Sequence, residues 1–315
     1  IGSADVILGL EIDSLWSAVN SMTDQLHRTT RSRLRPGAKL ISITSQDLYT
    51  KSNYQDFQRF QEVDLAIGGD AEATLPELIE QVRKLITADR RRFLQDRGTK
   101  VAAANARARE RARDEAALGW DASPLSTARV AAELWAQIKN KDWAMVSRGD
   151  SLSGWPQQLW DFSKPYHHIG ESGGVGVGYS APASVGAALA NKKHGRLCIN
   201  LQNDGDLMYA PGVFWTAAHH RIPMLTIMNN NRAYHAEVMH LQRMACRHNR
   251  DVTTAPIGNV MTDPNIDFAK FAQSMGWYAE GPITDPKDVG PAIRRALAVV
   301  ERGEPALLDT VVQPR

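Results

Sequence analysis

Two short apolar runs, each followed at once by a polar signature, constrain the fold of this chain more than any other feature. Residues 196–202 precede the signature Asn-Asp-Gly-Asp at 203–206, and residues 222–228 precede the signature Asn-Asn-Asn at 229–231. Each run is short, apolar and bounded by turn formers, which is typical of a buried parallel strand. Ligands bind at the carboxyl ends of the strands in open α/β sheets. Both signatures are therefore predicted to lie at a ligand-binding edge.

The residue types in these signatures suit a metal-bridged diphosphate. A hard divalent cation binds carboxylate, amide and phosphate oxygens, and Asp204 and Asn231 carry a carboxylate and an amide. Gly205 would let a phosphate approach the backbone, and a helix starting near Tyr209 would turn its N–H groups toward an anion. The alternative is a pair of ordinary strand-to-helix turns, since Asp, Asn and Gly are the usual turn residues.

The order of these motifs resembles the signature of thiamine diphosphate enzymes, Gly-Asp-Gly followed about one βαβ unit later by Asn-Asn. A glycine-rich stretch lies upstream at 172–182, Ser-Gly-Gly-Val-Gly-Val-Gly-Tyr-Ser-Ala-Pro, and Asn-Asn-Arg-Ala-Tyr lies at 230–234. Segments 263–272 and 305–312 extend the similarity, which covers residues 122 to the end. The chain is similar to benzoylformate decarboxylase and to acetolactate-synthase-like enzymes.

The resemblance implies an α/β fold of parallel sheets flanked by helices. We expect residues 1–88 to be part of the middle domain of that family and residues 123–315 to be the C-terminal domain that binds the diphosphate and magnesium. Between them, residues 89–122 are rich in Arg, Ala and Glu. Acidic residues alternate with the basic ones there, so a solvated helical linker is favoured over a nucleic-acid-binding segment.

Within these domains the patterns predict individual elements. In the first domain, buried strands are predicted at 6–10, 39–44 and 63–68, and a helix at 74–86 has Thr74 as its N-cap and Pro76 in its first turn. In the second domain the predicted strands are 143–146, the two runs above and 306–312, and the predicted helices are 127–138, 180–191, 212–220, 267–275 and 285–301. Alternation of this kind predicts a parallel sheet.

The resemblance also implies site residues. Asp204, the side chain of Asn231 and the backbone carbonyl of Ala233 would bind magnesium. Val177 falls where a bulky apolar side chain props the cofactor in its bent form, although a core valine fits its surroundings equally well. The residues implied in cofactor binding lie in four polar or glycine-rich segments and are Ser151, Ser153, Gly154, Gly176, Val177, Gly178, Asp204, Gly205, Asp206, Asn231, Ala233 and Tyr234.

Two residues depart from the family pattern. Asn203 replaces the first glycine of the signature, and Asp206 stands where a serine or another small residue is usual. A carboxylate beside a diphosphate repels it unless the carboxylate faces away or is compensated. These departures put cofactor affinity in question more than the fold.

Glu237 is the candidate for proton transfer, because relatives similar to pyruvate decarboxylase carry a glutamate at this offset from the tyrosine. Burial would raise its pKa for that role, whereas the competing interpretation is a surface carboxylate on an exposed helix. His235 replaces a small residue and would narrow or polarise the pocket. The other histidines of this region, His219, His220, His240 and His248, lack metal-ligand spacing with cysteines.

Composition restricts the remaining function classes. The 315 residues suit two domains, and a net charge of +2 gives no reason to expect nucleic acid or an anionic membrane as a partner. Two cysteines are too few for a disulfide framework. No apolar run is long enough to span a bilayer and no signal peptide is evident. A cytoplasmic protein is therefore expected.

These features predict a thiamine diphosphate- and magnesium-dependent enzyme that cleaves or joins a carbon–carbon bond next to a 2-oxo group. A 2-oxo acid decarboxylase is favoured, with an acetolactate-synthase-like carboligase or a non-catalytic cofactor-binding subunit as alternatives. The resemblance implies a homodimer or homotetramer and leaves FAD or ADP possible in the middle domain. The chain opens inside an expected strand and lacks the family's pyrimidine-binding domain, so we expect it to be one part of a longer protein.

Overall fold

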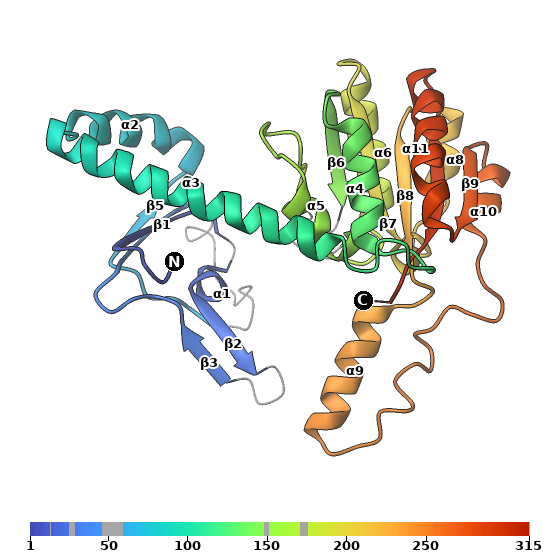
Figure 1. Ribbon diagram of the computed structural model, residues 1–315, viewed down its shortest axis with the longest axis horizontal. Helices are drawn as coiled ribbons and strands as arrows, with labels where there is room; N and C mark the ends of the chain where they lie inside the picture. The colour runs from blue at the N-terminus through green and yellow to red at the C-terminus, as the bar shows by residue number, and fades with distance from the viewer. Residues whose placement is uncertain (13, 25–28, 46–58, 148–150, 171–175, 315) are drawn as a thin grey trace. The chain divides into compact units, whose positions relative to one another are not determined.

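The computed structural model describes residues 1–315 except 13, 25–28, 46–58, 148–150, 171–175 and 315. The chain divides into two compact units, residues 1–101 with 243–250, and residues 102–242 with 251–315. Each unit contains its own parallel sheet (Figure 1). None of the described helices is both long enough and apolar enough to cross a membrane.

The first unit contains a three-stranded parallel sheet in the order β1-β4-β5. All three strands were predicted, and they are β1 (Val6–Leu10), β4 (Lys39–Thr44) and β5 (Leu65–Gly68). The elements that were not predicted are α1 (Leu15–Val19) and the antiparallel pair β2 (Asn20–Asp24) and β3 (Thr29–Ser32). The prediction that the strands are buried is wrong for most of β1 and for β5, because in this chain Leu15, Val19 and Leu40 form only a small core.

The helix after β5 begins earlier than predicted. It is α2 (Ala71–Lys84), and its N-cap is Asp70, whose carboxylate accepts a hydrogen bond from the Ala73 N–H at 3.0 Å. Thr74 is not the N-cap, because its hydroxyl donates to the Asp70 carbonyl from inside the first turn. Pro76 consequently lies in the second turn rather than the first. The stronger capping residue, aspartate, determined the start of the helix.

The Arg-rich segment forms the helix α3 (Ala88–Ala116). The segment predicted to be a helical linker, residues 89–122, is helical up to Ala116 and forms turns from there on, and the side chains of α3 are almost all exposed apart from Ala112 and Ala116. A helix without a broad apolar face is typical of a solvated connection between domains. The family assignments of segments 1–88, 89–122 and 123–315 stay predictions.

The second unit is built on a five-stranded parallel sheet in the order β6-β7-β8-β10-β9. Its strands are β6 (Trp143–Ser147), β7 (Leu197–Asn203), β8 (Leu225–Asn230), β9 (Tyr278–Ile283) and β10 (Ala306–Val311). Four of them lie where they were predicted. The edge strand β9 was not predicted, because its sequence contains Gly281 and Pro282, two residues that are rare inside strands.

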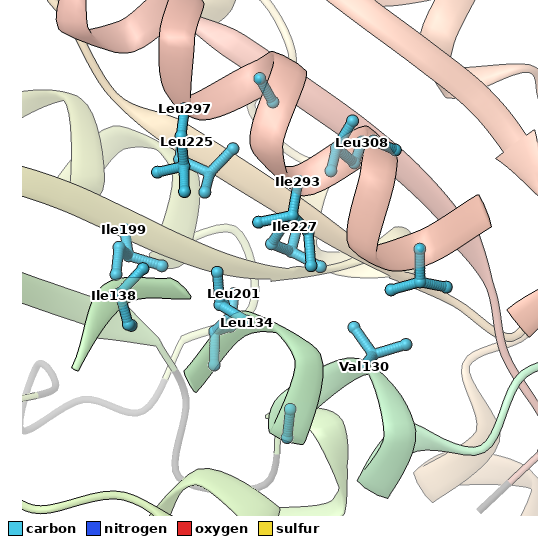
Figure 2. Close-up of a cluster of buried hydrophobic side chains, with 14 of the residues drawn as sticks. Val130, Leu134, Ile138, Ile199, Leu201, Leu225, Ile227, Ile293, Leu297 and Leu308 are labelled. Atoms are coloured by element: carbon cyan, nitrogen blue, oxygen red, sulfur yellow. The ribbon is translucent and has the colours of Figure 1, made fainter. Parts of the chain in front are cut away.

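Helices cover both faces of this sheet (Figure 1). On one face lie α4 (Thr127–Ile138) and α11 (Pro286–Glu301), and on the other α6 (Ser180–Lys192), α8 (Val213–His219) and α10 (Phe268–Ser274). The five helices were predicted to within one or two residues. Figure 2 shows the apolar core of the first face, where Leu134 and Ile293 from the helices meet Leu201 and Ile227 from the strands.

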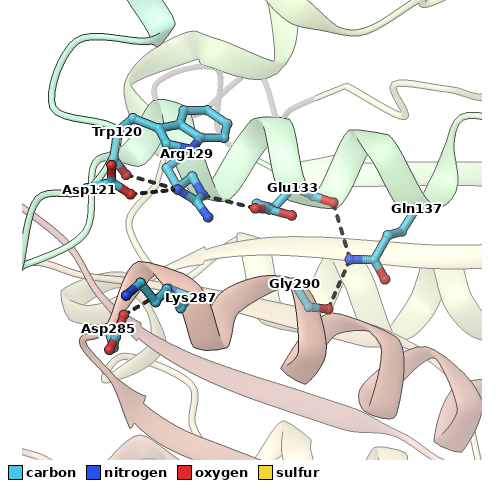
Figure 3. A network of polar contacts seen from close by, with 8 residues as sticks. All are labelled: Trp120, Asp121, Arg129, Glu133, Gln137, Asp285, Lys287 and Gly290. Carbon is cyan, nitrogen blue, oxygen red and sulfur yellow. Dashed lines mark hydrogen bonds and ion pairs between the residues drawn. The ribbon is translucent and has the colours of Figure 1, made fainter.

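A polar network joins α4 to α11 at the solvent side of this core (Figure 3). The buried guanidinium of Arg129 donates to Glu133 at 2.9 Å and to the Trp120 carbonyl at 3.2 Å. Gln137 donates its amide to the Gly290 carbonyl at 3.1 Å, which links the two helices directly. These contacts fix α4, whose first residue, Thr127, faces the candidate site described below.

A buried carboxylate on the central strand β10 should make stability depend on pH. Asp309 is fully buried, and burial raises its pKa to about 6 despite the hydrogen bond from Asn230 Nδ2 at 2.8 Å. Because the folded state then binds the proton more tightly than the unfolded state, stability is greatest below the ordinary pKa and falls as pH rises toward 6. The loss is roughly 3 kcal/mol.

Urea unfolding at several pH values checks this expectation. We expect the free energy of unfolding of the wild type, relative to that of Asp309→Asn, to fall by roughly 2 kcal/mol between pH 4 and pH 7. The variant is the control for the wild type, because all other titrating groups are the same in both proteins. A constant difference across this range would contradict a raised pKa at Asp309.

Candidate active site

The two polar signatures meet at the carboxyl end of neighbouring strands. Strands β7 and β8 pair in parallel with Asn203 opposite Asn229, so Asp204 and Asn231 emerge at the same edge of the sheet. They line one cavity, which lies entirely within the second unit. The lining residues are Thr127, Ser153, Val177, Asn203, Asp204, Gly205, Asp206, Asn229, Asn231, Ala233, Tyr234, His235, Ala236, Glu237 and Gln313.

Asp204 is the buried carboxylate of this cavity, with only 2% of its surface exposed. Its two oxygens accept backbone N–H groups, from Gly205 at 2.8 Å and from Arg232 at 2.6 Å. Burial nevertheless raises its pKa to about 6, because these hydrogen bonds offset only part of the cost of placing a charge there. A cation bound at this carboxylate would compensate that cost.

A tight turn after β8 presents Asn231 beside this carboxylate. Arg232 adopts a left-handed conformation with φ of 61°, and the Asn231 side-chain oxygen accepts the Ala233 N–H at 3.1 Å. The turn is held from outside by Asn259, whose carbonyl accepts the Tyr234 N–H at 2.8 Å. The three predicted magnesium ligands therefore lie around one cavity on a fixed backbone.

The ring of Tyr234 leaves room only for a glycine at position 205. A Cβ atom on Gly205 would lie 2.4 Å from a ring carbon of Tyr234, well inside van der Waals contact. The helix expected near Tyr209 in fact begins at Asp204, as the short helix α7 (Asp204–Leu207), and the next helix α8 starts only at Val213. The signature itself thus forms the first helical turn.

Both departures from the family signature are accommodated. Asn203 has φ of −77°, which needs no glycine, and its side-chain oxygen accepts a hydrogen bond from Asn229 at 2.9 Å. Asp206 is buried and compensated: its carboxylate accepts hydrogen bonds from Gly178 N–H at 2.7 Å and from Gln202 Nε2 at 2.9 Å. The fold tolerates both residues without strain at these positions.

The candidate acid–base residues lie at the start of α9 (His235–Arg247). Glu237 lines the cavity but is exposed, so the burial expected for it is not provided by this chain. His235 is half-buried, and its Nδ1 is buried without a hydrogen-bond partner among the residues that the structure describes. Either side chain could exchange protons with a molecule in the cavity.

Of the three candidates in the turn after β6, one lines the cavity. Ser153 does so, with φ of 56°, and its hydroxyl oxygen accepts a hydrogen bond from Thr127 at 3.3 Å. Ser151 is buried and does not line the cavity, nor does Gly154, which starts the short helix α5 (Trp155–Leu159).

The glycine-rich stretch contributes its last residues to the site. Val177 lines the cavity with its side chain 41% exposed, as expected of a residue that faces a ligand rather than the core. Gly178 has φ of 93°, and a Cβ there would lie 2.7 Å from the Cβ of Tyr209. Gly176 and Gly178 do not line the cavity, and residues 172–175 lie outside the described residues.

Three lining residues were not anticipated: Thr127, Ala236 and Gln313. Gln313 follows the last strand, so the rule that placed Asp204 at the carboxyl edge of the sheet could also have found it. Thr127 lies at the start of a helix that is distant in the sequence, and no local sequence signal indicates that this residue reaches the cavity. Among the described residues no group of three or more His, Cys, Asp or Glu side chains forms a metal site.

Comparison with known proteins identifies the family of the chain. Residues 151–310 match the family described as thiamine pyrophosphate enzyme, C-terminal TPP binding domain. The chain belongs to this family. The relatives described below are named as a decarboxylase and an acetolactate synthase subunit, so the family is one of enzymes. The matched residues include every residue that lines the cavity except Thr127 and Gln313.

Individual relatives support the same assignment. The chain is 34% identical over 139 residues to a Mycobacterium tuberculosis protein named as an acetolactate synthase large subunit, IlvX, covering 44% of this chain and 26% of the relative. It is 30% identical over 138 residues to benzoylformate decarboxylase of Pseudomonas aeruginosa, covering 44% and 23%.

A solved structure shows the same fold. The thiamine diphosphate-dependent 4-hydroxybenzoylformate decarboxylase of Rhodococcus jostii RHA1 superposes with a TM-score of 0.62 at 19% identity, covering 99% of this chain and 49% of that one. The predicted α/β fold is thereby confirmed. The chain spans about a quarter of the two curated relatives and about half of the solved structure.

Proposed function

We propose that this chain is the diphosphate- and magnesium-binding part of an enzyme that cleaves or joins a carbon–carbon bond next to a 2-oxo group. Decarboxylation of a 2-oxo acid is the reaction we favour. A pyrimidine-binding domain outside these residues would complete the site in a homodimer or homotetramer. FAD or ADP in the first unit is compatible with the same family.

The observation that carries this proposal is the pairing of Asp204 with Asn231 in one cavity. One buried carboxylate, one amide and the Ala233 carbonyl form an all-oxygen donor set of the kind that Mg²⁺ uses when it also binds phosphate. In the described part of the chain no basic side chain forms an ion pair with Asp204, whose hydrogen bonds come from backbone amides. The residues present therefore fit a cation that carries an anionic ligand.

When bound, thiamine diphosphate supplies a carbon nucleophile and an electron sink for the bond cleavage. The residues of this chain hold and orient it. Asp204 and Asn231 would fix the diphosphate end through magnesium, and Val177 would support the ring from the cavity wall. Glu237 and His235, which line the same cavity, would give and take protons at the reacting group.

Glu237→Gln should separate chemistry from binding. We expect kcat of the complete enzyme to fall by about a hundredfold or more, since positioned proton transfer contributes that much, while thiamine diphosphate affinity stays unchanged. Steady-state kinetics with a 2-oxo acid, beside calorimetric titration with the cofactor, measures both quantities. Glu115→Gln, on the exposed helix α3, is the matched control, and equal activity of the two variants would remove Glu237 from the mechanism.

Product analysis distinguishes the favoured reaction from its alternatives. The similarity to an acetolactate synthase subunit favours a carboligase as the second candidate, and the residues Asn203 and Asp206 favour a non-catalytic cofactor-binding subunit as the third. The full-length protein, supplied with magnesium, thiamine diphosphate and a series of 2-oxo acids, should release carbon dioxide and an aldehyde. Faster formation of acetolactate from pyruvate would establish the carboligase, and neither product would favour the non-catalytic subunit.

A further inference from the structure

The carboxylate of Asp206 lies in the cavity at a position where a bound anion would accept hydrogen bonds from backbone amides. One carboxylate oxygen accepts the Gly178 N–H at 2.7 Å, and the other accepts the Ser180 N–H at 3.3 Å. Ser180 is the first residue of α6, a helix of 13 residues. The carboxylate therefore accepts the hydrogen bonds of the backbone amides at the start of this helix. Without it, these amides would attract a phosphate.

Asp206 is held in this position from inside the protein. Gln202, which is fully buried, donates its amide to the second carboxylate oxygen at 2.9 Å. Asn200, also fully buried, donates in turn to the Gln202 side-chain oxygen at 3.1 Å. This buried polar chain along β7 fixes Asp206 between the end of the strand and the start of α6.

We propose that Asp206 determines how the cavity binds phosphate groups: it fills the anion position at the start of α6 and restricts a diphosphate to the Asp204 and Asn231 side, where magnesium is needed. This inference rests on the proposed function, because both place a diphosphate in the same cavity. Two observations support it together: Asp206 itself lines the cavity, and the buried hydroxyl of Ser180 has no hydrogen-bond partner within the described residues.

Inorganic pyrophosphate tests the proposal, because it needs no pyrimidine-binding domain. Calorimetric titration with pyrophosphate, with and without magnesium, would compare the wild type with Asp206→Ser and Asp206→Asn. We expect magnesium-free affinity to rise by about tenfold or more in Asp206→Ser, since charge repulsion is removed and two amides become available. The rise should be smaller in Asp206→Asn, which removes the charge but keeps an oxygen that accepts the Gly178 N–H. Asp285→Ser is the matched control, since Asp285 is an aspartate that caps α11 outside the cavity.

Hydrogen exchange gives a second readout at the amides themselves. In Asp206→Ser the Gly178 amide should exchange faster than in the wild type, and pyrophosphate should protect it again. Asp206→Asn keeps an acceptor for this amide and should protect it without ligand. This rescue would not be expected if Asp206 only filled space.

Each outcome decides the matter. Magnesium-free pyrophosphate binding gained by either Asp206 variant, and not by Asp285→Ser, supports the proposal even if one of them folds poorly. Folded variants that bind pyrophosphate as weakly as the wild type overturn it. A separate result decides the proposed function. That function requires magnesium to raise the affinity of the wild type for pyrophosphate and Asp204→Ala to abolish this rise, and it fails if either effect is absent.

Discussion

Asp204→Ala should abolish magnesium-dependent binding of thiamine diphosphate. Asp204 supplies the carboxylate of the proposed donor set, and the amide and carbonyl oxygens that remain carry no charge to hold a divalent cation. We expect the affinity to fall by at least about a hundredfold, because even residues behind the metal ligands are typically worth 10–100-fold. Calorimetric titration with the cofactor, with and without magnesium, measures this loss.

The same substitution should leave the fold intact or make it more stable at neutral pH. Burial raises the pKa of Asp204 to about 6. At pH 7 the buried side chain is therefore ionised, and this charge lowers the free energy of unfolding. Asp309→Asn is the matched control, because Asp309 is an equally buried carboxylate with a pKa raised to about 6 that does not line the cavity. Asparagine at this position keeps an oxygen that accepts the Asn230 amide. Both variants should remain folded, and only the Asp204 variant should lose the cofactor.

One result would contradict this expectation, and another would call for a second titration. Magnesium-dependent binding that survives Asp204→Ala would place the metal elsewhere in the cavity. Absence of binding to the wild-type chain would direct the titration to the full-length protein. Binding by the full-length protein would show that the pyrimidine-binding domain is needed to close the site, and its absence there as well would show that Asp206 has disabled the site.

Local sequence patterns predicted the elements that carry the site. The apolar runs before Asp204 and Asn229 are the strands β7 and β8, and the helix predicted at 127–138 is α4 with the same ends. These elements are encoded by periodicity and capping over a few residues. Because the sheet is parallel, their order was sufficient to bring the two signatures to one edge.

The remaining features depend on contacts between distant segments. No local pattern brings Thr127 to the turn that contains Ser153, or places the amide of Gly178 on Asp206. The exposure of Glu237 likewise depends on what covers the cavity rather than on the helix that carries it. Sequence reasoning therefore found the residues of the signature and missed the partners that hold them.

Gly281→Ala should destabilise the second unit strongly, although it adds only one carbon atom. Gly281 has φ of 141°, and a Cβ there would lie 2.6 Å from the Cβ and 2.8 Å from the carbonyl oxygen of Asp309. Asp309 lies on β10, which pairs with β8 on one side and β9 on the other, so neither strand can move without breaking pairing. We expect a loss of roughly 3 kcal/mol or more in the free energy of unfolding.

Gly303→Ala separates backbone strain from the steric clash. Gly303 also has a left-handed backbone, with φ of 93°, but a Cβ there would meet nothing within 4 Å. Its substitution should cost only about 1–2 kcal/mol, the strain of a non-glycine residue in that conformation. Urea unfolding of both variants gives the two values, and equal losses would show that β9 yields to the added atom.

The clash at Gly281 should also reach the site. Asp309 accepts the side-chain amide of Asn230 at 2.8 Å, and Asn230 directly precedes the proposed magnesium ligand Asn231. Displacing Asp309 would therefore move the turn that presents Asn231 beside Asp204. In conditions where Gly281→Ala is still folded, we expect weaker magnesium-dependent cofactor binding than in Gly303→Ala. Equal affinities would show that the turn is held by its contacts with Asp204 and Asn259 and is independent of β10.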